Sequence, residues 1–367
     1  MKTNQEREVV GEVIDRVVSI PLFFGGSFGK RPVALDLYDA ARQKFNHPLT
    51  YLAAERLVEL VKPGDSVIIT AGFVVPPWFS SEHDGPIGAL TLARALNISF
   101  DATPVIVTEE LLVENMTKLC QTSGFRVYDY EKAKSLPRRM AVEPFTLNED
   151  EAKSQAEELI DKINPTAIIA IEKPSRNSKG QYHAGMGLNL TSVSAKVDHL
   201  FDVAKSRGIL TIGIGDGGNE IGMGCIKDTV KKVVPTGSEC GCPCAAGTFA
   251  DTETDVLISA GVSNWGAYGL EAALAHSLER TEVMHDPQFE KEVVENSGRA
   301  GFVSPSHGFG IPWVDHISLQ VQVSIVEILN YLVHYRVDDS FVLRKYKEYM
   351  ADRTSMQETI DNWKNYV

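Results

Sequence analysis

Short apolar runs alternate with longer segments of helical period between residues 66 and 260. The runs are continuously apolar and rich in β-branched residues, as strands buried on both faces are. They are SVIIT (66–70), PVIVT (104–108), TAIIAIE (166–172), ILTIGI (209–214) and DVLISA (255–260), with FRVYDY (125–130) as a weaker sixth. The segments between them that carry apolar residues at helical spacing are 86–97, 109–122, 149–163 and 191–207. This order predicts an α/β fold: a doubly wound, mainly parallel, Rossmann-like sheet with helices on both faces.

Helical patterns also flank this central region. They cover residues 5–20, about 36–61, 264–280 and 317–335, and the tail beyond 338 is polar and helical in pattern. No internal repeat, low-complexity run or linker interrupts the chain. We therefore expect one α/β domain over residues 1–335 and a helical C-terminal extension over residues 336–367.

Composition narrows the possible partners. The chain has 367 residues, 43% of them apolar, and a formal net charge of −13, which argues against binding to nucleic acid or to an anionic membrane surface. No apolar run is long enough to span a bilayer, the amino terminus has no apolar signal core, and five cysteines do not make a disulfide framework. We expect a cytoplasmic protein whose partner is a small molecule or a metal ion. A homo-oligomer is possible.

Four loops carry most of the unusual residues, and each loop follows a predicted strand. They are residues 72–89, 172–187, 215–224 and 261–269. Because the carboxyl ends of parallel strands share one edge of the sheet, ligands bind in the crevice there. We expect the four loops to converge on a single site.

The glycine-rich loop GDGGNEIGMG (215–224) contains two carboxylates. The glycine spacing from Gly213 formally matches a dinucleotide-binding fingerprint, but Asp216 and Glu220 would repel a pyrophosphate. A divalent cation fits better, because Asp216, Asn219 and Glu220 offer the hard oxygen ligands that Mg²⁺ or Mn²⁺ prefers. A helix cap at Asp216 and a solvent-exposed Glu220 are the alternative.

The segment SSEHDGPIGA places two acids just ahead of Pro86. Acids before a proline at a helix start are ordinary, since both favour the first turn. Alternatively, Glu82 and Asp84 are metal ligands or acid–base groups, because one intervening residue can aim both at the same crevice.

The loop that follows the strand at 166–171 begins EKPSRN. Its glutamate and arginine suggest a substrate clamp, in which Arg176 binds a carboxylate and Glu172 an ammonium group. Loop packing is favoured over catalysis for His183.

Two further segments are ambiguous. In SNWGAYG, Asn264 either orients a ligand beside the aromatic face of Trp265 or simply caps a helix, as Ser263 could. Three cysteines, Cys240, Cys242 and Cys244, stand too close together in sequence for a usual structural zinc site, and no matching second pair follows. A metal or redox role is therefore not predicted for them.

Four of these motifs together resemble the D-glutamate cyclase family. The motifs are DGPIGALTLARAL, EKPSRNSKGQYHAGMG, GDGGNEIGMG and VSNWGAYGL, and the resemblance covers roughly residues 15–335. It implies a hydro-lyase that converts D-glutamate to 5-oxo-D-proline with loss of water, and a divalent metal, with Mn²⁺ expected before Mg²⁺. A manganese-dependent hydrolase or phosphatase acting on a small phosphorylated or carboxylated metabolite, and a non-catalytic binding protein for an amino acid, are the alternatives.

The chemistry of cyclisation gives each candidate residue an expected role. A metal would polarise the γ-carboxyl group, and a carboxylate would take the ammonium proton. The expected metal ligands are Glu82, Asp84, Asp216 and Glu220. The expected catalytic residues are Glu172, Asp84, Asp216 and Glu220. The expected substrate-binding residues are Arg176, Gly217, Gly218, Asn219, Asn264 and Trp265.

Two segments depart from the family pattern. Glu82-His83-Asp84 stands where the family usually has Glu-Thr-Asp, and GFVSPSHGFG (301–310) stands where a Val-Asp-Gly turn is expected. WVDHI (313–317) nevertheless keeps a later acid. If that turn contributes to the site, the substrate could differ.

Overall fold

A computed structural model describes residues 3–22 and 31–337, together with 348, 351, 357, 358 and 360–365. The predicted C-terminal extension over 336–367 falls mostly outside these residues. Within the described part of the chain, no helix combines the length and apolar character that a membrane crossing requires.

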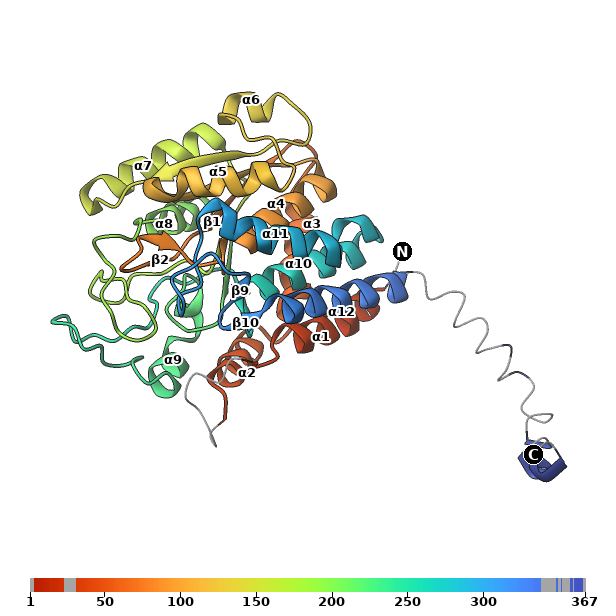
Figure 1. Cartoon of the computed structure of the whole chain (residues 1–367). Coiled ribbons are helices and arrows are strands. Elements are labelled where there is room, and N and C mark those ends of the chain that lie inside the picture. Colours follow the sequence, from red (N-terminus) through yellow and green to blue (C-terminus); the bar gives the residue numbers. More distant parts are fainter. Residues whose placement is uncertain are drawn as a thin grey trace.

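A six-stranded parallel sheet forms the centre of the molecule and confirms the predicted doubly wound fold (Figure 1). Its strands lie in the order β5–β4–β1–β6–β7–β8. Their bounds are β1 (Ser66–Ala71), β4 (Thr103–Glu109), β5 (Ala141–Phe145), β6 (Ala167–Ile171), β7 (Leu210–Gly215) and β8 (Val256–Ser259). The chain order reverses between β1 and β6, so the loops that follow these two strands flank the position where open α/β sheets bind ligands.

Successive side chains of each strand enter two different cores, as a sheet covered on both faces requires. In β1, Val67 and Ile69 pack into one core and Ile68 into the other. The helices that contribute to the first core include α3 (Leu49–Leu60), α4 (Pro86–Phe100), α5 (Val113–Thr122) and α10 (Ser263–Ser277). The second core is formed by α6 (Tyr130–Lys134), α7 (Glu149–Ile163) and α8 (Asp198–Arg207) (Figure 1).

Helix α10 is buried from Ser263 to His276, because a further layer of helices covers it. That layer includes α1 (Asn4–Val18) and α12 (Leu319–Val337), while α11 (Pro287–Ala300) packs against α12. Close approach to the sheet depends on Gly266, where a Cβ would lie 2.5 Å from Ile214 Cγ2. The other helices of the described residues are α2 (Val33–Phe45) and α9 (Lys227–Val233). Four short strands form two small hairpins, β2 (Val74–Val75) with β3 (Ser80–Ser81) and β9 (Trp313–Val314) with β10 (Ile317–Ser318). The 3₁₀ turns in the described residues are η1 (Glu110–Leu112), η2 (Met223–Ile226), η3 (Thr281–Val283) and η4 (Trp363–Asn365).

Several local predictions were wrong. The helix expected over 36–61 is two helices, because Asn46 ends α2 in a left-handed conformation and Pro48 then caps α3. The segment FRVYDY is not a strand. The strand at this edge of the sheet is β5, which was not predicted because it contains Pro144. Proline is nevertheless tolerated in an edge strand. The helix expected over 191–207 begins only at Asp198. In addition, helix α11 was not predicted.

A buried ion pair joins three strand ends beside the switch point. Lys173 Nζ lies 2.5 and 2.6 Å from the two carboxylate oxygens of Glu109 and donates to Gly72 O at 2.9 Å. Both charged side chains are completely buried. Glu109 also accepts a hydrogen bond from Ala195 N at 3.0 Å. The pair therefore connects the ends of β1, β4 and β6.

We expect Lys173→Met to lower the free energy of unfolding by about 3–5 kcal/mol, because the Glu109 carboxylate would be left buried without its partner. The double variant with Glu109→Gln should recover much of this loss, since the unpaired charge is then removed as well. A double-mutant cycle in urea, followed by circular dichroism, measures both effects. A loss below about 1 kcal/mol, which is typical of exposed ion pairs, would contradict the prediction.

Candidate active site

Six acidic side chains from four segments meet at the carboxyl edge of the sheet. The segments are the loops after β1, β6 and β7 and the hairpin between β9 and β10. The residues are Glu82, Asp84, Glu172, Asp216, Glu220 and Asp315, and their carboxyl groups influence one another's ionisation. The structure thus brings the predicted acids together and adds Asp315.

Five of these acids form two overlapping groups of three. Oxygen atoms of Asp84, Asp216 and Asp315 all lie within 4.8 Å of one another. Oxygen atoms of Glu172, Asp216 and Glu220 do the same. Asp216 belongs to both groups and is half-buried between them. Each group has the donor type and the spacing that a divalent cation with oxygen ligands requires.

Backbone amides at the start of α10 hold Asp84. Ser263 N donates to Asp84 Oδ2 at 2.9 Å, and Asn264 N donates to Oδ1 at 2.7 Å. A third donor, Gly85 N, lies 3.0 Å from Oδ1. The positive end of a helix favours a negative charge at this position. These contacts fix the carboxylate in one orientation.

The side chain of Asn264 organises the neighbouring helix. Its Oδ1 accepts hydrogen bonds from Gly85 N at 2.9 Å and Gly88 N at 2.8 Å, at the start of α4. Its Nδ2 donates to His83 O at 3.3 Å. The amide of Asn264 is therefore engaged by the protein, and its predicted contact with substrate gains no support.

The glycine loop binds its own glutamate. Gly217 N donates to Glu220 Oε1 at 2.9 Å, and Gly218 N donates to Oε2 at 2.8 Å. Gly217 and Gly218 were expected to bind the substrate, but their amides are engaged by Glu220, so that role has no support either. Asn219, a further predicted substrate contact, donates from Nδ2 to His183 O at 2.9 Å. The glycines make room for a carboxylate of the protein itself.

Asp315 was not among the predicted site residues. It occupies a two-residue turn between β9 and β10, in which both Asp315 (φ 47°) and His316 (φ 63°) are left-handed. This is the backbone of a type I′ hairpin, in which asparagine, aspartate and glycine are the usual residues. The later acid in WVDHI was the available signal, and the absence of a glycine after it concealed the turn.

Burial and mutual repulsion make these acids hard to ionise. Burial raises the pKa of Glu172 well above its usual value, and the carboxylates of Asp216 and Glu220 raise it further. Burial likewise raises the pKa of Asp216, and the charges of Asp315 and Asp84 make the next largest contributions. The pKa of Asp315 is raised by burial to about 6. Negative neighbours reinforce the effect of burial at Glu172 and Asp216, whereas hydrogen bonds with Asp84 and Asp216 lower the pKa of Asp315. A bound cation would offset the repulsion and stabilise the cluster.

The three residues of the segment 82–84 have different surroundings. Glu82 is half-buried and belongs to neither group of three, although Asp315 and Asp84 both affect its ionisation. His83 points away, with Nδ1 2.7 Å from Ser297 Oγ on α11, and burial lowers its pKa to about 4. His83 is thus a neutral packing residue.

Two predicted substrate contacts lie elsewhere. Arg176 forms a two-fold hydrogen bond with Asp202 of α8, at 2.9 and 2.8 Å, which engages its guanidinium. Trp265 is completely buried in the core, and its Nε1 donates to Gln322 Oε1 at 2.6 Å. The clamp assigned to Arg176 and the aromatic contact assigned to Trp265 therefore gain no support from their surroundings.

Comparison with known proteins identifies the family of the chain. A family model described as "D-glutamate cyclase-like, C-terminal" matches residues 32–330. The chain belongs to this family. It is also 39% identical over 108 residues to the Homo sapiens protein named "D-glutamate cyclase, mitochondrial", an overlap that covers 29% of this chain and 16% of the human protein. The matched family region contains all six acids.

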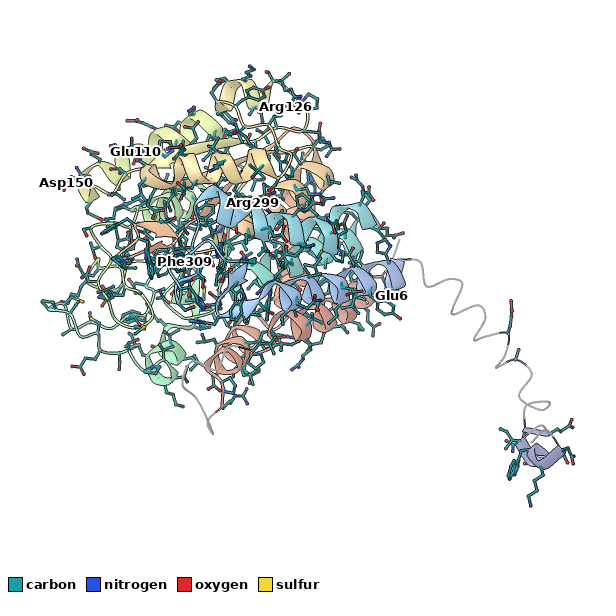
Figure 2. The ribbon with its side chains drawn as sticks, viewed as in Figure 1. Glu6, Glu110, Arg126, Asp150, Arg299 and Phe309 are labelled. Atoms are coloured by element: carbon teal, nitrogen blue, oxygen red, sulfur yellow. The ribbon has the colours of Figure 1, made fainter. Side chains whose placement is uncertain are left out.

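We expect Asp216→Asn to stabilise the metal-free protein, because it removes the charge that both groups of three share. The same change should abolish stabilisation by Mn²⁺, which at 100 times its dissociation constant adds about 2.7 kcal/mol to the wild-type protein. Thermal unfolding with EDTA and with Mn²⁺ measures both effects. Asp150→Asn, at an exposed position on α7, is the matched control (Figure 2). Equal Mn²⁺ stabilisation in both variants would contradict the prediction.

The raised pKa values also predict how stability depends on pH. An acid whose pKa is higher in the folded than in the unfolded protein binds more protons when folded, so stability falls as pH rises through the folded value. Unfolded carboxyl groups titrate near about 4, and Asp315 titrates at about 6 with the others raised. We therefore expect metal-free protein to lose stability as the pH rises from about 4 through about 6, and to keep losing it above pH 6 because the pKa of Asp216 is also raised. Urea unfolding at several pH values measures this effect, and the loss of stability with rising pH should be smaller for Asp216→Asn than for the wild-type protein.

Proposed function

We propose that the chain cyclises D-glutamate to 5-oxo-D-proline with loss of water, using a divalent cation, with Mn²⁺ preferred over Mg²⁺. The observation that carries the proposal is the acidic cluster itself: among the described residues, no cation is found to offset the charge of the carboxylates around Asp216. Family membership supports the reaction type, and the human relative's name supports the substrate.

Two groups of acids share Asp216, and Glu172 is the member that remains for proton transfer. The residues that would hold the cation are the other four, Asp84, Asp216, Glu220 and Asp315. A cation bound there would offset their charge and polarise the γ-carboxyl group of the substrate as a Lewis acid. Backbone amides already fix Asp84 and Glu220, so these two carboxylates are suited to ligation in a set geometry.

Glu172 is suited to move the proton. Ring closure requires a neutral α-amine, which in water carries a proton, so a base must remove it. Ser263 Oγ donates to Glu172 Oε2 at 2.6 Å, and burial raises the pKa of Glu172 well above its usual value, which makes its carboxylate a stronger base than that of an ordinary glutamate. The nitrogen loses a second proton when the amide forms, and the same carboxyl group can pass both protons in turn to the oxygen, which then leaves as water.

Glu172 is held for this role by its backbone. It has a positive φ of 45°, and a Cβ at Gly85 would lie 3.0 Å from Glu172 Cβ, so the residue stands in close contact with the loop that carries Asp84. A base in a fixed position favours an intramolecular reaction, because the amine and the γ-carboxyl group of one substrate molecule then need only be held in the correct orientation.

A metal-dependent phosphatase is the second candidate. The shared Asp216 is the observation that favours it, because a carboxylate between two oxygen-ligand sets is the arrangement of a two-metal centre. Such centres activate water for attack on phosphate esters. The same acids would then serve hydrolysis.

We expect Glu172→Gln to lower the rate of 5-oxoproline formation from D-glutamate by about 10²–10⁴-fold, the usual contribution of an acid–base group. Chromatographic detection of the product with Mn²⁺ present measures the rate. Glu110→Gln, at an exposed surface position, should keep full activity (Figure 2).

Two parallel incubations separate the alternatives. L-glutamate tests the stereochemical preference, and a generic phosphate ester tests hydrolysis. Release of phosphate without any 5-oxoproline would replace the cyclase proposal with the phosphatase. Mn²⁺ stabilisation should persist in Glu172→Gln; its complete loss would assign Glu172 to metal binding instead of proton transfer.

A further inference from the structure

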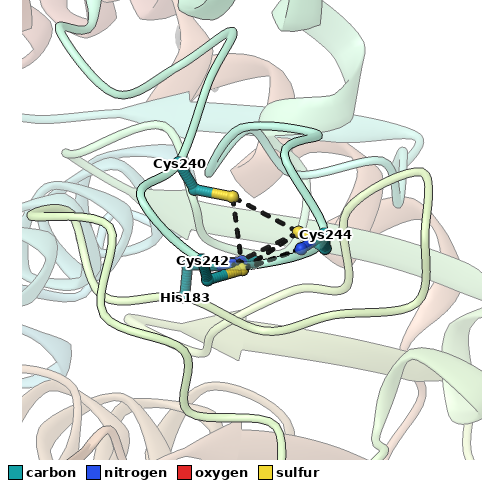
Figure 3. Close-up of side chains that lie close together, drawn as sticks. All are labelled: His183, Cys240, Cys242 and Cys244. Atoms are coloured by element: carbon teal, nitrogen blue, oxygen red, sulfur yellow. Dashed lines mark hydrogen bonds between the residues drawn. The ribbon is translucent and has the colours of Figure 1, made fainter.

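A second cluster of chemically distinct side chains lies beside the acidic site. His183 from the loop after β6 meets Cys240, Cys242 and Cys244, and all four potential ligand atoms lie within 4.8 Å of one another. Figure 3 shows the imidazole and the three thiols pointing toward a common centre. Residues nearly 60 positions apart in sequence form the cluster, which explains why the cysteine spacing alone did not indicate it.

The distances between these atoms are too long for a disulfide and come close to those between the ligands of one metal ion. The three sulfur atoms lie 3.2, 3.3 and 3.4 Å apart, and His183 Nε2 lies 3.2 Å from Cys242 Sγ and 3.7 Å from Cys244 Sγ. A disulfide would require sulfurs about 2.05 Å apart. A tetrahedral zinc ion with bonds of about 2.3 Å to sulfur sets its sulfur ligands roughly 3.8 Å apart, somewhat wider than the separations here.

Amide groups surround the sulfurs as they do around metal-bound thiolates. Cys244 N donates to Cys242 Sγ at 3.4 Å. Asn189 Nδ2 lies 3.7 Å from Cys242 Sγ, and Asn177 Nδ2 lies 3.6 Å from Cys244 Sγ. Hydrogen bonds of this kind stabilise negative charge on sulfur and orient the ligands.

We propose that His183, Cys240, Cys242 and Cys244 bind one structural zinc ion. Four protein ligands complete a tetrahedral shell and leave no position for substrate, so the ion stabilises the fold and takes no part in the reaction. Binding converts the three thiols to thiolates and releases their protons to solvent.

The zinc ion would clamp two long loops next to the acidic cluster. The backbone oxygen of His183 accepts the hydrogen bond from Asn219 Nδ2, and Asn219 immediately precedes Glu220. Thr236 Oγ1 donates to Gly185 O at 2.6 Å, which joins the cysteine segment to the same loop. The metal would therefore support the glycine loop without contacting it.

Metal analysis of the whole protein, purified under reducing conditions and dialysed against EDTA, tests the proposal. We expect about one zinc per chain. Cys242→Ser should lose it, whereas Cys225→Ser, which changes a half-buried cysteine outside the cluster, and Asp216→Asn should both retain it. Cobalt exchanged into the wild-type protein should show the intense visible bands of a tetrahedral thiolate site.

Because Cys242→Ser could unfold, zinc is also removed from the wild-type protein with a thiol-reactive mercurial, which is then withdrawn with excess thiol. Re-addition of Zn²⁺, and not of Mg²⁺, should restore the original melting temperature and one zinc per chain. Zinc content equal in Cys242→Ser and wild type, or a disulfide among the three cysteines detected by mass spectrometry with no zinc bound, would overturn the proposal.

Discussion

Repulsion among buried carboxylates is the constraint around which the rest of the structure is organised. Burial alone disfavours each charge, and gathering Asp84, Glu172, Asp216 and Glu220 in one place adds to that cost. A fold tolerates such a cluster only if other interactions hold it together. The amides at the start of α10 and in the glycine loop do this locally, by directing donors at the acids.

The loops that carry the acids are also fastened to one another. Ser175 N donates to Asn219 O at 2.9 Å, and Ile221 N donates to Lys173 O at 2.9 Å, so the segments after β6 and β7 pair as a short antiparallel bridge. The buried pair of Lys173 and Glu109 anchors this bridge to the strand ends. The acids that repel one another therefore lie on backbone segments that are hydrogen-bonded together and cannot readily separate. The packing of the core thus fixes the geometry of the site.

The parts of the fold that depend on local pattern were predictable from the sequence. Continuous apolar runs identified five of the six strands of the sheet, and acids placed directly after them identified Asp216 and Glu172. Side-chain partners were not predictable: Arg176 turns to Asp202 because α8 happens to pass beside it. The same holds for contacts between distant segments. Asp315 and the His183–cysteine cluster arise only once the sheet brings remote loops together, and no local period encodes that meeting.

The two clusters differ in the metals they would accept, and that difference has a physical consequence. Zinc binds most mixed nitrogen, oxygen and sulfur sites more tightly than Mn²⁺ does, so affinity alone would not keep zinc out of an acidic site. Oxygen ligands such as Asp84 and Asp216 suit hard cations, whereas Cys240 and Cys242 offer soft sulfur. A chain that separates hard from soft ligands, while joining them through Asn219 and His183, could hold a structural ion and a catalytic ion side by side without exchange between them.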